Sequence, residues 1–176
     1  MTVLTAEVQI GRTNPRLPPI EDRRFVTGQG TFVDDLKFPG MLHMAVLQSP
    51  MAHARISNID IAEALKVEGV RAVLLGEEAR RLSNPIPHAL KVQVSRYCLA
   101  LDEVRYAGEP IAAVAAESPY SARDAADLIK VEYEPLPVVV DIGEALEGKI
   151  LVHEELGTNV VYHDVFDYSK DIDAAL

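Results

Sequence analysis

The alternation of apolar and polar residues predicts several short strands. Five segments have strand-like patterns and are bounded by Pro, Gly or Ser residues: 41–47, 54–61, 70–75, 111–116 and 131–140. The alternation in 54–61 is interrupted at 57–58, which predicts a local irregularity in that strand. In the last segment, Pro135 and Pro137 remove backbone donors, so we expect the hydrogen-bond ladder to end there.

The clearest helix is predicted over 119–130. Ser118 can cap it, and Pro119 occupies the first helical position, where a missing amide hydrogen costs nothing. A narrow apolar face suited to packing on a sheet recurs at helical spacing through Ala122, Ala125, Ala126 and Ile129. Shorter helices are predicted over 61–67 and 76–82. A strand, a helix and a strand therefore follow one another between 111 and 140.

Three parts are expected along the chain. Residues 1–20 contain three prolines and predict an extended arm. Residues 21–147 hold the predicted elements, and 25–35 is interpreted as a turn between extended pieces because it contains two glycines. Residues 148–176 form an acidic tail, whose last residues, 171–176, have the pattern of a first helical turn.

Composition indicates an ordinary folded domain. The chain has 176 residues, of which 48% are hydrophobic, so it is long enough to bury a core without a metal or a disulfide. Cys98 is the single cysteine, so no internal disulfide can form. Its apolar neighbours predict a buried packing residue with blunted reactivity.

Charge and hydropathy exclude several classes of partner. The net charge is −10, and the only basic pairs, Arg23–Arg24 and Arg80–Arg81, have acidic neighbours, which disfavours nucleic-acid binding. No apolar run approaches the ~20 residues of a membrane helix. The first residues lack the layout of a signal peptide, so we expect a cytoplasmic protein without a membrane or nucleic-acid partner.

Recognisable catalytic motifs are scarce. Gly28 and Gly30 lack the third glycine and the following helix of a dinucleotide-binding loop. No two of the five histidines are three or four residues apart, so no zinc or iron–sulfur site can be recognised. His43 is expected at a core or edge position of its strand. His53, beside a Ser-Pro turn, is the more exposed candidate for a substrate or cofactor contact, and Glu109 is expected to accept amide hydrogen bonds in its turn.

Two motifs resemble a known family. Residues 99–117 (LALDEVRYAGEPIAAVAAE) and 129–138 (IKVEYEPLPV) resemble the N-terminal α/β-hammerhead domain of molybdenum hydroxylase large subunits. This group comprises the xanthine dehydrogenases, aldehyde oxidases and carbon monoxide dehydrogenases. Earlier segments agree in order: 27–35, 39–43, 49–56 and 69–73. The likeness is greatest to the carbon monoxide dehydrogenase-like branch, in which the iron–sulfur and flavin domains are separate chains.

This resemblance implies an α+β fold, an α/β-hammerhead with a mixed β-sheet and two or three packed helices. One departure lies at 48–53, where Gln48 and Met51 replace the family's Arg and His. This departure weakens any role of positions 48 and 51 at a shared surface.

In this family the molybdopterin cytosine dinucleotide and the catalytic glutamate belong to a longer segment after the hammerhead domain, and none of those motifs occurs here. The resemblance therefore implies no catalytic, cofactor-binding or metal residue in this chain, and no activity for the chain alone. The implied partners are the remainder of the molybdopterin-binding subunit and subunits carrying 2Fe-2S clusters and FAD. The candidate residues for loops facing a partner or the substrate funnel are His53, Gly108, Glu109 and Pro110.

Two other functions stay open. A free-standing binding or regulatory module of this fold predicts a polar surface and a monomer, whereas part of a larger enzyme predicts exposed apolar area and self-association. An independent hydrolase using Glu109 and His53 requires those two side chains to converge in one pocket.

Overall fold

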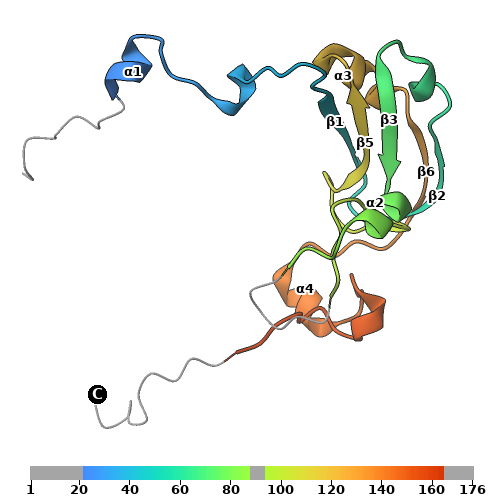
Figure 1. Cartoon of the computed structure of the whole chain (residues 1–176). Helices are drawn as coiled ribbons and strands as arrows, with labels where there is room; N and C mark the ends of the chain where they lie inside the picture. Colours follow the sequence, from blue (N-terminus) through green and yellow to red (C-terminus); the bar gives the residue numbers. More distant parts are fainter. Residues whose placement is uncertain (1–21, 88–93, 165–176) are drawn as a thin grey trace, which may run out of the picture. The chain divides into compact units, whose positions relative to one another are not determined.

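The computed structural model describes residues 22–87 and 94–164 (Figure 1). The chain divides into two units, Met1–Pro39 and Gly40–Leu176. The predicted arm at 1–20 and the predicted helical turn at 171–176 lie outside the described residues. Within the described residues no helix is long and apolar enough to cross a membrane.

The described part of the first unit, residues 22–39, contains two short helical segments, α1 (Asp22–Val26) and η1 (Val33–Asp35). The expected turn is present at Gly28, whose φ of +70° suits glycine. The flanking pieces are helical rather than extended, so that part of the prediction was wrong. The Asp35 carboxylate accepts a hydrogen bond from the Phe32 amide at 2.9 Å, which favours a tight helical turn over an extended segment.

In residues 40–87 and 94–164, the second unit holds two three-stranded sheets, and every strand pairing there is antiparallel. In the first sheet the order is β1 (His43–Gln48), β5 (Pro110–Ala116) and β3 (Val70–Leu75). In the second sheet the order is β4 (Glu103–Val104), β2 (Ala54–Asp60) and β6 (Lys130–Pro135). The fold class is confirmed, with two small antiparallel sheets in place of one mixed sheet.

Two details of the strands agree with the sequence pattern. The register of β2 against β6 shifts between Ile56 and Asn58, where the alternation breaks. Strand β6 ends at Pro135, because the prolines there cannot donate to a neighbouring strand.

Helix α3 (Pro119–Asp127) begins as predicted, and the Ser121 amide donates to Ser118 Oγ at 3.0 Å. It ends before 130 because Lys130 already pairs with Asp60 in the second sheet. The remaining helical segments of this unit are η2 (Ala64–Lys66), α2 (Gly76–Leu82), α4 (Ile142–Glu147) and η3 (Glu154–Leu156). Only a 3-10 turn forms in 61–67, and α4 is an element that the pattern did not predict.

Two apolar clusters form the core. In the first, α3 packs on β1 and β5 through small side chains: Ala45, Ala112, Val114, Ala116, Ala122, Ala125 and Ala126. The second contains Ala54, Ala100, Val104 and Ile111. Ile59 and Val131 pack against both clusters and so join the two sheets. The hydrophobic interior is therefore continuous across the unit.

Gly76 and Cys98 show how the segment before β4 packs. A Cβ added at Gly76 would lie 2.0 Å from the Ala100 carbonyl oxygen, so the start of α2 requires glycine. Cys98 is exposed, which contradicts the prediction of a buried thiol. The reason is local: its neighbours Leu99 and Ala100 take the buried positions, and the irregular backbone turns Cys98 outward.

Candidate functional site

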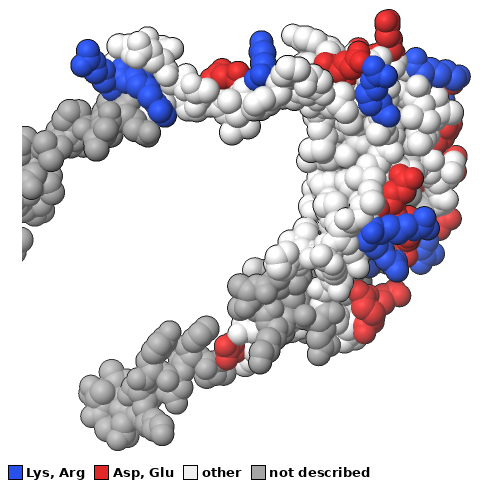
Figure 2. All heavy atoms as spheres, in the orientation of Figure 1, with Lys and Arg blue, Asp and Glu red and all other residues white. Residues whose placement is uncertain are grey.

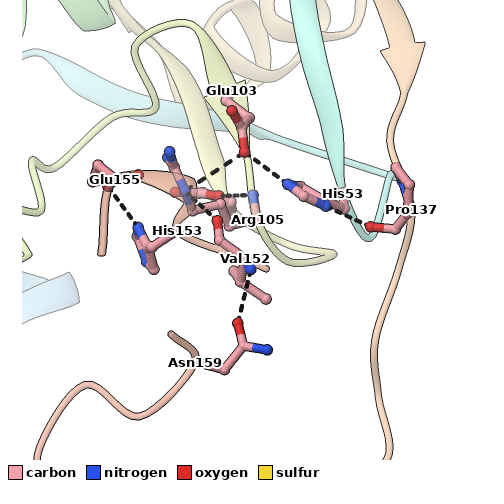
Figure 3. Close-up of polar contacts among 9 residues, drawn as sticks. His53, Glu103, Arg105, Pro137, Val152, His153, Glu155 and Asn159 are labelled. Atoms are coloured by element: carbon pink, nitrogen blue, oxygen red, sulfur yellow. Dashed lines mark hydrogen bonds and ion pairs between the residues drawn. The ribbon is translucent and has the colours of Figure 1, made fainter. Parts of the chain in front are cut away.

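The candidate site is built around His53, which precedes β2. Its Nε2 lies 2.7 Å from Glu103 Oε1, and its Nδ1 lies 2.7 Å from the Pro137 carbonyl oxygen (Figure 3). His53 is 8% exposed, so the expectation that it is an exposed loop residue was wrong. It is buried because both ring nitrogens have partners within the chain, which removes the cost of leaving water.

The two contacts of His53 constrain its protonation. The Pro137 carbonyl can only accept, so Nδ1 carries a hydrogen and donates it. In a neutral ring Nε2 would then be an acceptor facing a carboxylate oxygen. The ring nitrogen that contacts Glu103 is therefore the one opposite the Pro137 hydrogen bond.

Arg105 extends this polar network toward the end of the described chain. Its Nε lies 3.7 Å from Glu103 Oε1 and donates a hydrogen bond to the Val152 carbonyl at 3.1 Å. Glu103 and Arg105 are two residues apart on a short extended segment, so their side chains leave it on the same side. As Figure 3 shows, these contacts connect β4 to the segment around Val152.

The segment around Val152 is held by Asn159. The Asn159 amide nitrogen donates to the carbonyls of Ala145 at 3.0 Å and Ile150 at 2.7 Å, and its Oδ1 accepts from the Val152 amide at 2.9 Å. All three of these hydrogen bonds join the Asn159 side chain to backbone groups. Residues 145–159 therefore form a cross-linked loop attached to β4 through Arg105.

A histidine–carboxylate pair lies on the same loop. His153 Nδ1 lies 3.0 Å from Glu155 Oε1. The pKa of Glu155 lies below its ordinary value, first because a hydrogen bond from its own backbone amide stabilises the carboxylate, and then because of His153 and the Arg105 charge. This pair is on the surface and differs from the buried His53–Glu103 pair.

The other candidate residues lie in the turn before β5. Glu109 Oε2 accepts the Arg105 amide at 2.6 Å, as expected for an amide acceptor in this turn. The backbone of the turn is tied to Ser49: Gly108 donates to its carbonyl, and Glu109 accepts from its amide, each at 2.8 Å. Gly108 has a φ of +91°, which explains a glycine there, and Pro110 accepts from Ala100 at 2.7 Å. The turn is rigid because its polar groups bond to the chain itself.

Two cavities border these residues. The larger, of about 560 Å³, is lined in part by Arg96, Tyr106, Glu109 and His153. The smaller, of about 160 Å³, is lined in part by His53, Pro137 and Lys149. His53 and Glu109 do not share either cavity, so the geometry does not bring together the acid–base pair that the hydrolase hypothesis requires.

No metal shell is formed by the described part of the chain, where no three His, Cys, Asp or Glu side chains converge. His43 is half-buried at the start of β1, in keeping with the expected edge or core position. Sequence reasoning missed Glu103, Arg105 and Asn159. Glu103 and Arg105 alternate along the chain shortly before the predicted strand at 111–116, and this alternation is a signal that could have identified them. No sequence pattern points to Asn159.

Comparison with known proteins agrees with the fold. The family model described as "Aldehyde oxidase and xanthine dehydrogenase, a/b hammerhead domain" matches residues 27–137. Among solved structures, quinoline 2-oxidoreductase from Pseudomonas putida 86 superimposes with a TM-score of 0.76 and 44% sequence identity, covering 81% of this chain and 19% of that one.

Curated relatives are much longer than this chain. The 6-hydroxypseudooxynicotine dehydrogenase complex subunit gamma of Paenarthrobacter nicotinovorans is 47% identical over 138 residues, which are 74% of this chain and 17% of the relative. The carbon monoxide dehydrogenase large chain of Hydrogenophaga pseudoflava is 40% identical over 141 residues, which are 80% of this chain and 17% of the relative. The chain therefore spans about a sixth of the length of these two relatives.

Proposed function

This chain belongs to the aldehyde oxidase and xanthine dehydrogenase family through its a/b hammerhead domain, and from that membership we propose its function. It is the N-terminal, non-catalytic part of a molybdopterin-dependent hydroxylase large subunit, inert when alone. The observation that carries this proposal is the coverage: the similarity spans most of this chain but only 17% of the two curated relatives.

The polar network supports a structural role. His53, Glu103, Arg105 and Glu109 all bond to other groups of the chain, which supports a role in holding the backbone. The described residues do not fit a metal ligand set. We assign the molybdopterin cytosine dinucleotide to the remainder of the large subunit, and the 2Fe-2S clusters and FAD to partner subunits. The complete enzyme would be cytoplasmic and would insert oxygen from water at a carbon centre.

Within that enzyme, the role of this chain is to pack on the cofactor-binding part and to help shape the substrate funnel. The turn 108–110 is its funnel- or partner-facing loop, and the buried His53 anchors the chain nearby through Glu103 and Pro137. Their rigidity supports this role, because a wall that positions a substrate must hold its shape. In this proposal the chain is divided into an arm at 1–20, the hammerhead domain at 21–147 and an acidic connecting tail at 148–176.

Exposed apolar side chains favour this proposal over a free-standing module. Val140 and Ile142 are 87% and 79% exposed, although the same unit also holds a continuous apolar core. A module that works alone is expected to present a polar surface instead.

The test is reconstitution. The 176-residue chain would be co-expressed with the P. nicotinovorans subunit gamma lacking the segment to which it aligns. We expect the two pieces to purify together and molybdenum to accompany only the larger piece. Stoichiometric molybdenum or turnover in the isolated chain would overturn the proposal, and so would a failure of the two pieces to associate.

A further inference from the structure

Past the hammerhead strands, the second unit exposes a run of large apolar side chains. We call this run the 138–162 surface; its exposed members are Val138, Val140, Ile142, Leu146, Val160, Val161 and Tyr162. Helix α4 buries none of its residues, and Leu146 is 67% exposed. The exposed members therefore remain in contact with water, whereas Ile150, Leu151, Val152 and Leu156 of the same stretch are partly buried.

The backbone that carries these side chains is nevertheless well fixed. Asp141 caps α4 by accepting the Glu144 amide at 3.0 Å, and Gly148 closes the helix with a φ of +69°. Asn159 ties the helix end to the irregular segment at 150–152, and Arg105 ties that segment to β4. Residues 141–159 are therefore held in place by hydrogen bonds, although α4 has no buried side chain beneath it.

Two pairs of these side chains each share one side of the backbone that carries them. Ile142 and Leu146 are four residues apart on α4 and lie on one side of it. Val138 and Val140 alternate along the extended chain before α4, and only the intervening Val139 is partly buried. The hydrogen bond from Asn159 to the Ala145 carbonyl brings residues 160–162 next to the end of the helix.

We infer that the 138–162 surface is the docking site for the remainder of a molybdenum hydroxylase large subunit, which contributes a complementary apolar surface. This inference rests on the proposed function and specifies where its interface lies. The family model ends at residue 137, so the surface begins where the hammerhead match stops. The two curated relatives have about five-sixths of their length outside the match, which supplies the polypeptide to cover it.

Charge argues for this occupant over two others. Asp141, Glu144 and Glu147 lie beside the apolar residues, so an anionic membrane surface would be repelled. A symmetric pairing of two copies would set the same acidic residues against each other. An apolar centre with a polar rim is typical of a protein–protein contact. Figure 2 shows that charged side chains gather around α2 in this unit.

The experiment uses the co-expression pair described above, with aspartate substitutions in the full chain. The test variant is Ile142→Asp combined with Leu146→Asp. The control is Leu65→Asp, which changes a residue that is 53% exposed in η2, outside the surface. Circular dichroism and the unfolding midpoint check folding, and both are expected to stay unchanged because α4 buries no side chain.

The inference predicts that the double variant lowers the amount of co-purified subunit gamma piece at least tenfold, while Leu65→Asp and the unchanged chain bind equally. Equal binding by the double variant would overturn the inference and leave the proposed function standing. Loss of self-association alone, measured by light scattering, would identify a contact between copies and would also overturn it. Failure of the unchanged chain to bind the subunit gamma piece would instead contradict the proposed function.

Discussion

His53 and Glu103 hydrogen-bond side chain to side chain at 2.7 Å, although 50 positions separate them in sequence. The contact joins the residue before β2 to the first residue of β4, and the second ring nitrogen of His53 joins both to the chain beyond β6. One imidazole therefore links three segments of the second sheet. The network matters for stability because each of its groups is withdrawn from water.

Removing the carboxylate should destabilise the chain. Glu103→Ala leaves a buried ring nitrogen without a partner, and we expect the free energy of unfolding to fall by about 1–3 kcal/mol. Glu103→Gln keeps an oxygen acceptor and should lose less. Urea denaturation followed by circular dichroism measures both. An alanine variant as stable as the unchanged chain would show that the pair contributes nothing.

Gly76→Ala should be strongly destabilising because the new methyl group would meet the Ala100 carbonyl oxygen at 2.0 Å. Overpacking of this kind costs about 1–3 kcal/mol, since the backbone has to shift. Glu78→Ala, at an exposed position of the same helix, should change stability by less than about 0.5 kcal/mol. The thermal unfolding midpoints of the two variants would be compared. Equal midpoints would contradict the close contact between position 76 and the Ala100 carbonyl oxygen.

Ser118→Ala should weaken α3 by removing the acceptor of the Ser121 amide. Loss of such a cap costs about 0.5–2 kcal/mol. Ser118→Asp keeps an acceptor oxygen and is expected to restore most of that stability. If chemical denaturation showed the aspartate variant to be as weak as the alanine variant, the cap would not be the reason for the loss.

Asn159→Ala should loosen the loop locally rather than unfold the chain. The variant removes the acceptor of the Val152 amide and both donors to the loop carbonyls. We expect hydrogen–deuterium exchange at Val152 to accelerate at least tenfold while β5 keeps its protection. Lys149→Ala, at an exposed residue of the same loop, is the matched control and should leave Val152 protected.

Acid should release the Glu155 contact. The folded chain holds the pKa of this carboxylate below 4.5, so its contribution is present above the unfolded value and disappears as pH falls through the lower folded value. The effect is small because the group is exposed. Glu155→Gln should abolish the change in the His153 ring resonances over that acidic range, and an unchanged titration would exclude the pairing.

The strands were predictable because their signals are local. The apolar runs at β1 and β5, the break in β2 at 57–58 and the cap at Ser118 each follow from a few neighbouring residues. The helical pieces around Gly28 were missed because their short turns depend on single side-chain hydrogen bonds such as that of Asp35. The end of α3 was misplaced because pairing of Lys130 with Asp60 is a tertiary contact.

In the candidate site, too, local contacts could be predicted from the sequence and distant ones could not. Glu109 could be predicted as a turn acceptor because its partner, Arg105, is four residues away. The burial of His53 could not, since it depends on Glu103 and Pro137, which are distant in sequence. Cys98 was misplaced because apolar neighbours indicate a buried segment without saying which of its side chains points inward.

The hydrogen bond from Arg105 to the Val152 carbonyl has a mechanical consequence. Because Asn159 holds the loop on one side of that bond and Arg105 follows β4 on the other, the bond joins the segment after α4 to the second sheet. The contact of Arg105 with Glu103 and that of Glu103 with His53 continue this connection as far as the buried imidazole, so a single arginine side chain spans the seam between the sheet and the loop.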